Sequence, residues 1–420
     1  MTGNDLPLLR TELPGPQSRA WVDRLAAREC PGVTARRARR AAALGASDTD
    51  PVVWSEALGS NVLDVDGNVL VDLCAGFGVA ALGHRHPAVV AAGQAQLARL
   101  PHAMGDAFPD VRRIELMERL CVLTGMDRVL FGSSGSDAVE AAIKTARLAT
   151  GRSRILSFEG GYHGLASAPL AVIGYHVDAF QGPFQPLLGT HGDLAPWGGP
   201  FPDLQGYAAV LVEPLQGRGG MRAPPAGWLA ALHAAARAAG TLVIHDEIYC
   251  GFGRAGAWLA GAPLQPDLLC IGKALAGGYP ISACLGTAAA MDAWGASKGE
   301  AIHTQTFLGN PVGCAMALAS LEEMQRIDLP ARVRETGAWL TEHILAVPGV
   351  HGVTGRGLML GVRVDHALAL MRAMQARGYL VLPAGEHGEV LGFTPPLTTS
   401  REVLAGAVEA LRASIAEGRP

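Results

Sequence analysis

The sequence predicts an α/β protein with a large domain built on a mainly parallel sheet and a smaller α+β domain formed by both chain ends. Two observations support this. Short apolar runs alternate with amphipathic or Ala-rich helical stretches over roughly residues 70–305, as expected of buried parallel strands joined by crossover helices. The last third returns to mixed helices and short strands. We therefore expect residues 1–69 and 306–420 to share the smaller domain.

The predicted strands are short and continuously apolar, which is typical of strands covered by helices on both faces. They lie at residues 129–131, 154–157, 209–212, 242–245 and 268–271, and predicted helices include 137–150 and 227–239. Alternating apolar positions around Asp66-Gly67 predict a two-stranded hairpin within residues 61–72. Ligands of such sheets bind at the carboxyl ends of the strands.

Composition narrows the classes of partner. With 420 residues, 49% of them hydrophobic and 17% charged, the chain can bury a large core. The formal charge of -4 offers no basic excess for a nucleic acid or an anionic membrane, so we expect a small-molecule substrate. The one dense basic cluster, at Arg36, Arg37, Arg39 and Arg40, is interpreted as a solvated helix face.

Targeting and redox signals are few. No apolar stretch of about 20 residues and no signal-peptide core are present, so we expect a soluble, cytoplasmic protein. The seven cysteines are scattered singly, without the close pairs of a zinc site, which predicts reduced and mostly buried thiols and no bound metal.

The first segment with a chemical signature is FGSSGSDAVE at residues 131–140, where a strand runs through a Gly/Ser turn into a helix. Free backbone N–H groups and the positive end of the helix dipole favour an anion such as phosphate at Ser134, Gly135 and Ser136. An ordinary helix cap has the same composition, so this segment alone leaves both readings open.

The second segment is GGYHG at residues 160–164, directly after the strand at 154–157. Tyr162 is placed to stack on a planar cofactor at the ligand end of the sheet, and His163 stands beside it. A surface tyrosine and a hydrogen-bonded polar histidine are the structural alternatives.

The third and fourth segments place a carboxylate and a lysine after buried strands. Asp246 and Glu247 end the apolar run that begins at Leu242, and a buried carboxylate needs a partner such as a pyridinium nitrogen. Lys273 follows the strand at 268–271, where burial lowers the pKa of its ammonium and makes the amine nucleophilic toward an aldehyde. A lysine that reaches solvent is the alternative.

In this order and spacing, the four segments resemble the class III (ω- or ornithine/4-aminobutyrate-type) aminotransferases that depend on pyridoxal 5'-phosphate (PLP). The resemblance extends from about Asp48 to the end of the chain. It includes VEPLQG at 212–217, TQTFLGNP at 304–311, GRGLM at 355–359 and PPL at 395–397. It implies the PLP-dependent transferase fold of aspartate aminotransferase, a homodimer with shared active sites, and transfer of an amino group from an amine or amino acid to a keto acid.

The resemblance also implies roles for individual residues. Lys273 would form the Schiff base with PLP and move the proton, and Asp246 would pair with the pyridine nitrogen. Gly135 and Ser136 would hold the phosphate. The other expected cofactor contacts are Ser134 and His163, Tyr162 and Ile248 on the two ring faces, and Thr306 on the phosphate bound by the neighbouring subunit.

Three positions depart from the family pattern. Many relatives carry a carboxylate-binding arginine where this chain has Gly392, and some carry an acid where it has Arg218. We hypothesise that Arg218 binds the substrate carboxylate, because guanidinium suits bidentate recognition; a solvent-facing loop arginine is the alternative. Tyr249 replaces a common glutamine that contacts the cofactor. Glu213 matches an acid near the substrate or the cofactor.

Two other functions are open at this point. An amino-acid racemase or epimerase of the same family would use the same lysine, aspartate and phosphate loop, but would return the proton to the substrate carbon. A non-catalytic binding protein would keep only the fold, which the intact lysine and aspartate make less favourable.

Overall fold

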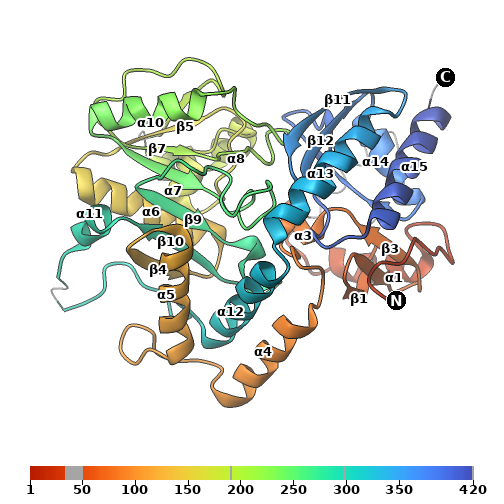
Figure 1. Ribbon diagram of the computed structural model, residues 1–420, viewed down its shortest axis with the longest axis horizontal. Helices are drawn as coiled ribbons and strands as arrows, with labels where there is room; N and C mark the ends of the chain where they lie inside the picture. Colours follow the sequence, from red (N-terminus) through yellow and green to blue (C-terminus); the bar gives the residue numbers. More distant parts are fainter. Residues whose placement is uncertain (34–50, 190–191, 297–298, 419–420) are drawn as a thin grey trace.

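The computed structural model describes residues 1–33, 51–189, 192–296 and 299–418. Figure 1 shows a large sheet with helices on both faces and, beside it, two smaller sheets where the chain ends meet. The arginine cluster at residues 36–40 lies outside the described residues.

A seven-stranded sheet forms the large part of the molecule. Its strand order is β4 (Arg128–Gly132), β10 (Ser282–Gly286), β9 (Leu268–Ile271), β8 (Leu242–Asp246), β7 (Tyr207–Val212), β5 (Arg154–Phe158) and β6 (Gly192–Ala195). All neighbours pair in parallel except β10, which is antiparallel to both β4 and β9. The five strands predicted from the sequence are all present.

Helices cover this sheet on both faces because its strands are apolar on both. In β9, Leu268 and Cys270 share a buried cluster with α6 (Gly135–Thr150). Their neighbours Leu269 and Ile271 share another cluster with α5 (Val111–Thr124) and α12 (Pro311–Arg326). Helix α10 (Trp228–Ala239) packs on β5, β7 and β8. Packing on both faces therefore fixes the positions of the strand ends.

The two chain ends meet in a four-stranded sheet. It contains β1 (Trp54–Leu58), β2 (Asn61–Asp64), β3 (Val69–Asp72) and β13 (Tyr379–Leu380). Strands β2 and β3 form the predicted hairpin. Strand β3 pairs in parallel with β13 from the C-terminal third, so a smaller α+β unit from both ends is observed. The domain boundaries at residues 69/70 and 305/306 remain predictions.

The second small sheet has the order β11 (Val350–Arg356), β12 (Met359–Val364), β15 (Val390–Phe393) and β14 (Leu382–Ala384). The remaining helices are α1 (Pro16–Ala26), α3 (Ala75–Gly78), α4 (Pro87–Arg99), α7 (Ser167–Ala171), α8 (Val177–Gln181), α9 (Gln185–Leu188), α11 (Ala288–Met291), α13 (Leu329–Leu345), α14 (Ala367–Ala376) and α15 (Arg401–Glu417). Short 3-10 turns occur at Gly182–Phe184, Lys273–Ala276 and Asp292–Trp294.

None of the helices described is long and apolar enough to cross a membrane. Cys74, Cys250, Cys270, Cys284 and Cys314 are buried, which confirms the prediction of mostly buried thiols. The cytoplasmic location stays a prediction.

Candidate active site

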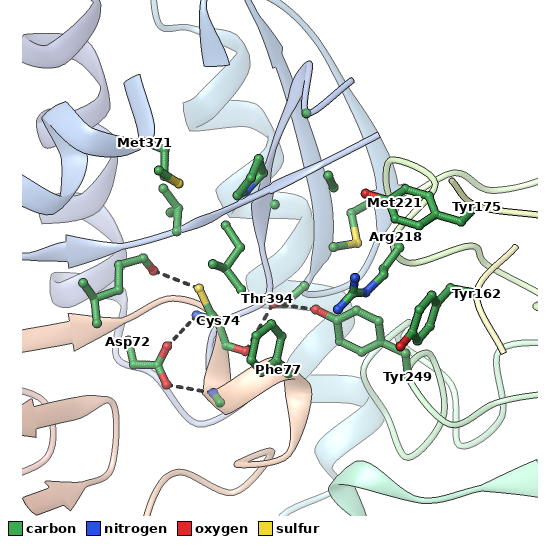
Figure 2. Close-up of a pocket in the computed structure, with 18 of the residues that line it drawn as sticks. Asp72, Cys74, Phe77, Tyr162, Tyr175, Arg218, Met221, Tyr249, Met371 and Thr394 are labelled. Carbon is green, nitrogen blue, oxygen red and sulfur yellow. Dashed lines mark hydrogen bonds between the residues drawn. The ribbon is translucent and has the colours of Figure 1, made fainter. Parts of the chain in front are cut away.

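A cavity of about 1660 Å³ lies at the carboxyl ends of the parallel strands, between the large sheet and the two small ones. Figure 2 shows the part of it that the aromatic side chains and Arg218 line. The structure brings nearly all of the sequence-predicted site residues to this cavity. They are Ser134, Gly135, Ser136, Tyr162, His163, Glu213, Arg218, Asp246, Ile248 and Lys273.

The N-terminus of α6 forms one wall. Ser134 is its N-cap: its Oγ accepts a hydrogen bond from the Asp137 backbone N–H at 3.2 Å, and Asp137 Oδ2 accepts one from the Ser134 N–H at 2.8 Å. This capping box fixes the turn. Gly135 and Ser136 occupy the first helical positions, whose N–H groups have no acceptor within the helix. They provide an anion site at the positive end of the dipole.

The loop after β5 packs tightly against this helix end. Ser136 Oγ accepts a hydrogen bond from the Leu165 backbone N–H at 3.1 Å. Gly164 has φ +109°, and a Cβ added there would lie 1.9 Å from that same oxygen. On the other side, a Cβ at Gly135 would come within 3.0 Å of Ile248. Glycine at both positions lets the backbone approach whatever binds at the helix end.

Asp246, the last residue of β8, carries a buried carboxylate with two partners. Its Oδ2 lies 2.8 Å from Nδ1 of His163, and its Oδ1 accepts a hydrogen bond from the Ile248 backbone N–H at 3.1 Å. Both side chains are nearly inaccessible, with Asp246 4% and His163 3% exposed. His163 therefore orients the carboxylate, which can face a cationic ring nitrogen in the cavity.

Lys273 follows β9 through Gly272 and has a positive φ of +38°, which is unusual for a residue with a side chain. Burial lowers the pKa of its ammonium, although the nearby carboxylates of Asp246 and Glu213 act in the opposite direction. Lys273 is therefore the neutral, nucleophilic amine in a larger fraction of the protein molecules.

Glu213 links two loops of the site. Its Oε1 accepts the Tyr162 backbone N–H and its Oε2 the Gly217 backbone N–H, each at 3.0 Å. Burial raises the pKa of its carboxyl group. Because both oxygens are bound by backbone, the evident role of Glu213 in this structure is to hold the loops that carry Tyr162 and Arg218. A direct contact with substrate remains a prediction.

Arg218 projects into the cavity among aromatic rings, as Figure 2 shows. Its guanidinium carbon lies 4.3 Å from the ring centroid of Tyr162 and 6.0 Å from that of Tyr175. Within the part of the chain that the structure describes, no carboxylate pairs with it. Gly392 also lines the cavity, and Met221 lies close to it, with its methyl 3.1 Å from a Cβ placed at Gly392.

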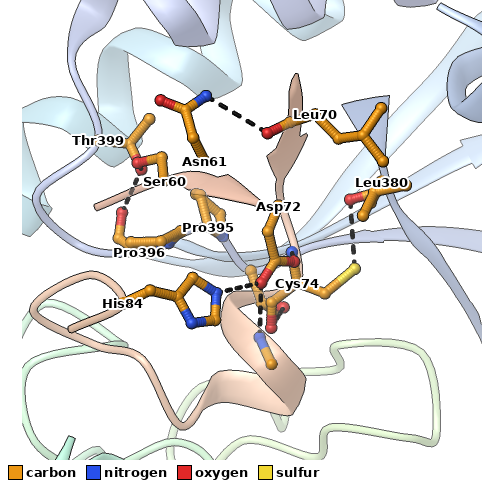
Figure 3. A network of polar contacts seen from close by, with 12 residues as sticks. Ser60, Asn61, Leu70, Asp72, Cys74, His84, Leu380, Pro395, Pro396 and Thr399 are labelled. Carbon is orange, nitrogen blue, oxygen red and sulfur yellow. Dashed lines mark hydrogen bonds and ion pairs between the residues drawn. The ribbon is translucent and has the colours of Figure 1, made fainter. Parts of the chain in front are cut away.

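A polar network fixes the wall contributed by the small sheets (Figure 3). Asp72 accepts hydrogen bonds from the Cys74 and Gly76 backbone N–H groups, each at 2.8 Å, and its Oδ2 lies 2.8 Å from Nε2 of His84. Ser60 Oγ lies 2.7 Å from Thr399 Oγ1. The network joins residues 60–84 to the segment that follows β15.

Thr306 is exposed and does not line the cavity of its own chain. Sequence reasoning also missed several residues that shape the site, namely Gly164, Tyr175, Met221 and Thr394. Gly164 lies in the same GGYHG segment as Tyr162, so the sequence offered a signal for it. The other three come from loops and strands whose place beside the cavity depends on long-range pairing.

The arrangement fits PLP. A helix N-terminus framed by glycines suits the phosphate, a buried carboxylate suits a protonated ring nitrogen, and an amine with a lowered pKa suits the aldehyde. Tyr162 and Ile248 line the cavity between these three groups.

Comparison with known proteins agrees with this chemistry. The family described as Aminotransferase class-III matches residues 44–190 and 205–415. The acetylornithine aminotransferase of Methanosarcina mazei is 35% identical over 369 residues, covering 86% of this chain and 91% of that protein. That of Mycobacterium tuberculosis is 37% identical over 394 residues, covering 90% and 96%.

Solved structures give the same picture. The ornithine aminotransferase of Toxoplasma gondii has a TM-score of 0.84 at 28% identity and covers 97% of both chains. An amine transaminase from an uncultivated Pseudomonas species, in its PLP-bound form, has a TM-score of 0.81 at 30% identity and covers 88% of this chain and 95% of that one. These aminotransferases give no support to the racemase alternative. The chain belongs to the class III aminotransferases and is a PLP-dependent enzyme of that family.

Proposed function

We propose that Lys273 is the residue that binds PLP covalently and Asp246 the residue that pairs with its ring nitrogen. Gly135 and Ser136 hold the phosphate, and Ser134 shapes that turn as the helix cap. Tyr162 and Ile248 enclose the ring. The observation that carries the proposal is the convergence of Lys273, Asp246 and the α6 N-terminus on one cavity.

When bound, PLP supplies an aldehyde that joins amines and a ring that withdraws electrons from the reacting carbon. The residues of this chain do the rest. Asp246, held by His163, would pair with the ring nitrogen and favour its protonated form. The neutral amine of Lys273 would take the proton from the substrate carbon that bears nitrogen. The lowered pKa of Lys273 favours the neutral amine that this step needs.

We propose further that Arg218 binds a substrate carboxylate in place of the arginine missing at Gly392. Its guanidinium has no carboxylate partner among the described residues and is held over the Tyr162 ring. Because Gly392 stands where that arginine would be, we expect the amino donor to be an ω-amine or an amino acid that reacts at a distal amine. Paired donor and acceptor assays with pyruvate, 2-oxoglutarate and an aldehyde identify the substrates.

We infer that the enzyme acts as a homodimer in which Thr306 contacts the phosphate bound by the neighbouring subunit. Support comes from the exposure of Thr306 and of four large apolar side chains, Met104, Phe108, Ile302 and Phe307. Ile302 and Phe307 are near Thr306 in the chain, and Met104 and Phe108 flank Gly105, where an added Cβ would lie 2.9 Å from the Leu308 carbonyl oxygen. Sedimentation equilibrium tests the association. Thr306→Ala should weaken PLP binding by about tenfold if the contact exists.

The decisive experiment follows the covalent link. Borohydride reduction of the PLP-saturated protein, followed by peptide mass spectrometry, should place the pyridoxyl group on Lys273. Lys273→Ala should lose both the label and transamination, whereas Lys144→Ala, which removes a half-exposed lysine of α6, should keep both. A label that persists in Lys273→Ala would refute the assignment.

A further inference from the structure

Tyr249 occupies a narrow slot beside the catalytic lysine. It stands three residues after the end of β8, at a position where the family resemblance implies a glutamine. A Cβ added at Gly78 would lie 2.4 Å from the Tyr249 ring, and one added at Gly217 would lie equally close, at 2.4 Å. The tyrosine ring fits only because both neighbours are glycine. The slot is therefore shaped for an aromatic side chain.

The hydroxyl group fixes the far end of the ring. Tyr249 Oη lies 3.1 Å from Thr394 Oγ1, and the Thr394 backbone N–H donates to the Leu73 carbonyl at 2.8 Å. Figure 2 shows the hydrogen bond between Tyr249 and Thr394 as a dashed line. With glycines on either side and an anchored hydroxyl, the ring has little freedom to rotate or shift.

The ring faces the amine of Lys273. Nζ of Lys273 lies 4.5 Å from the Tyr249 ring centroid, within the distance at which an ammonium is attracted to an aromatic face. Glutamine has no such face. The tyrosine therefore gives this chain a contact with the catalytic lysine that glutamine at the same position does not provide.

We propose that Tyr249 is a positioning residue for Lys273, holding its amine over the aromatic ring whenever that amine is not bonded to the coenzyme. The proposal rests on the role assigned to Lys273 above. Other charged or titratable groups act on the same amine. Asp246, Glu213 and Cys250 favour its protonated form, and Arg218 opposes it. The ring adds a favourable contact for the ammonium from the side of the small sheets.

The full-length chain freed of PLP provides the test, because its lysines are Lys144, Lys273 and Lys298. Trace labelling with acetic anhydride over a range of pH, read by peptide mass spectrometry, gives the titration midpoint of Lys273, with Lys144 as internal reference. Tyr249→Leu removes the aromatic face and should lower the midpoint by about 0.5 to 1.5 pH units. Tyr249→Phe keeps the face and should leave the midpoint where it is.

An unchanged midpoint in Tyr249→Leu overturns the proposal, and so does an equal shift in Tyr249→Phe. Should the leucine variant fail to fold, as judged by circular dichroism, Tyr249→Gln carries the same expectation and the same refuting result. The labelling does not depend on PLP attachment. A failure of the proposed role of Lys273 would appear in the borohydride experiment and not here, so the two outcomes are distinguishable.

Discussion

Nδ1 of His163 lies 2.8 Å from Oδ2 of Asp246, and both side chains are almost fully buried in the wall of the cavity. A carboxylate in this position is stabilised by its hydrogen bonds and by a cation above it, because an unpaired buried charge is costly. The pair links the loop after β5 to the end of β8. Sequence alone placed both residues near the cofactor but did not show that one acts through the other.

Removing the charge of Asp246 should impair catalysis strongly. Asp246→Asn would break the proposed ion pair between Asp246 and the PLP ring nitrogen. Because breaking a buried ion pair costs about 3–5 kcal/mol, this variant should lower kcat/KM by about 100-fold or more. His163→Ala removes one hydrogen bond to a charged group, worth about 1.5–3 kcal/mol, and should cost about 10- to 100-fold. Steady-state kinetics measure both. His343→Ala, on the exposed face of α13, serves as control and should behave like the wild type. An Asp246→Asn enzyme within threefold of wild type, a difference of about 0.6 kcal/mol, contradicts the assignment.

Gly164→Ala should weaken coenzyme binding through Ser136. The added methyl would lie 1.9 Å from Ser136 Oγ on a backbone with φ +109°, so the loop or the helix end must move. We expect PLP affinity to fall at least about tenfold, which corresponds to about 1.4 kcal/mol. Absorbance titration of the coenzyme-free enzyme measures it.

Gly182→Ala is the matched control for this change. A Cβ added at Gly182 meets no described atom within 4 Å, and its φ of -46° suits alanine. Its PLP affinity should equal that of the wild type. Equal affinity in Gly164→Ala as well would show that the loop does not support the phosphate site.

Much of the large sheet was predictable because its strands are continuous apolar runs that need no knowledge of their partners. Strand β10 was missed: it runs antiparallel between β4 and β9, and its sequence, SACLG, is small and short. Strand β6 was also missed, and it is an edge strand of four residues with partly exposed positions. Local periodicity carries no signal for either.

The site was predictable where motif and strand end coincide, as for Lys273 and Asp246. Tyr175 and Thr394 could not be found this way, because their place beside Tyr162 and Tyr249 arises from contacts across distant segments. Helix α6 begins at Gly135, two residues before the predicted helix at 137–150, because the capping box at Ser134 places Gly135 and Ser136 in the first turn.

Glu247 should make stability depend on pH. Burial raises the pKa of its carboxyl group from 4.5 to about 7, against the backbone N–H groups of Ala260 and Gly261 that stabilise the charge. Between pH 4.5 and about 7, the Glu247 carboxyl group is ionised in the unfolded chain but still protonated in the folded protein. The folded state therefore loses stability as pH rises through this range, by about 3 kcal/mol in all, and loses no more above about pH 7. Glu247→Gln removes this slope.

Urea unfolding at about pH 5 and about pH 8 measures the effect as a difference between wild type and variant. The free energy of unfolding of Glu247→Gln minus that of wild type should be more positive, meaning a relatively more stable variant, at the higher pH. Glu342→Gln, an exposed change on α13, should show no such pH dependence. A pH-independent difference for Glu247→Gln would mean that its carboxyl group titrates in the folded protein as it does in the unfolded chain.

Arg218→Ala should separate substrates by charge. A hydrogen-bonded guanidinium–carboxylate contact is worth about 1.5–3 kcal/mol, so KM for carboxylate substrates such as 2-oxoglutarate should rise about 10- to 100-fold. A donor without a carboxylate, such as 1-phenylethylamine, should keep its rate in a half-reaction, because Arg218 then has no anion to bind. Arg326→Ala, on the exposed end of α12, is the control for loss of a positive charge. If KM stays the same for every carboxylate substrate, Arg218 only packs against the rings of Tyr162 and Tyr175, and the anion must be bound elsewhere.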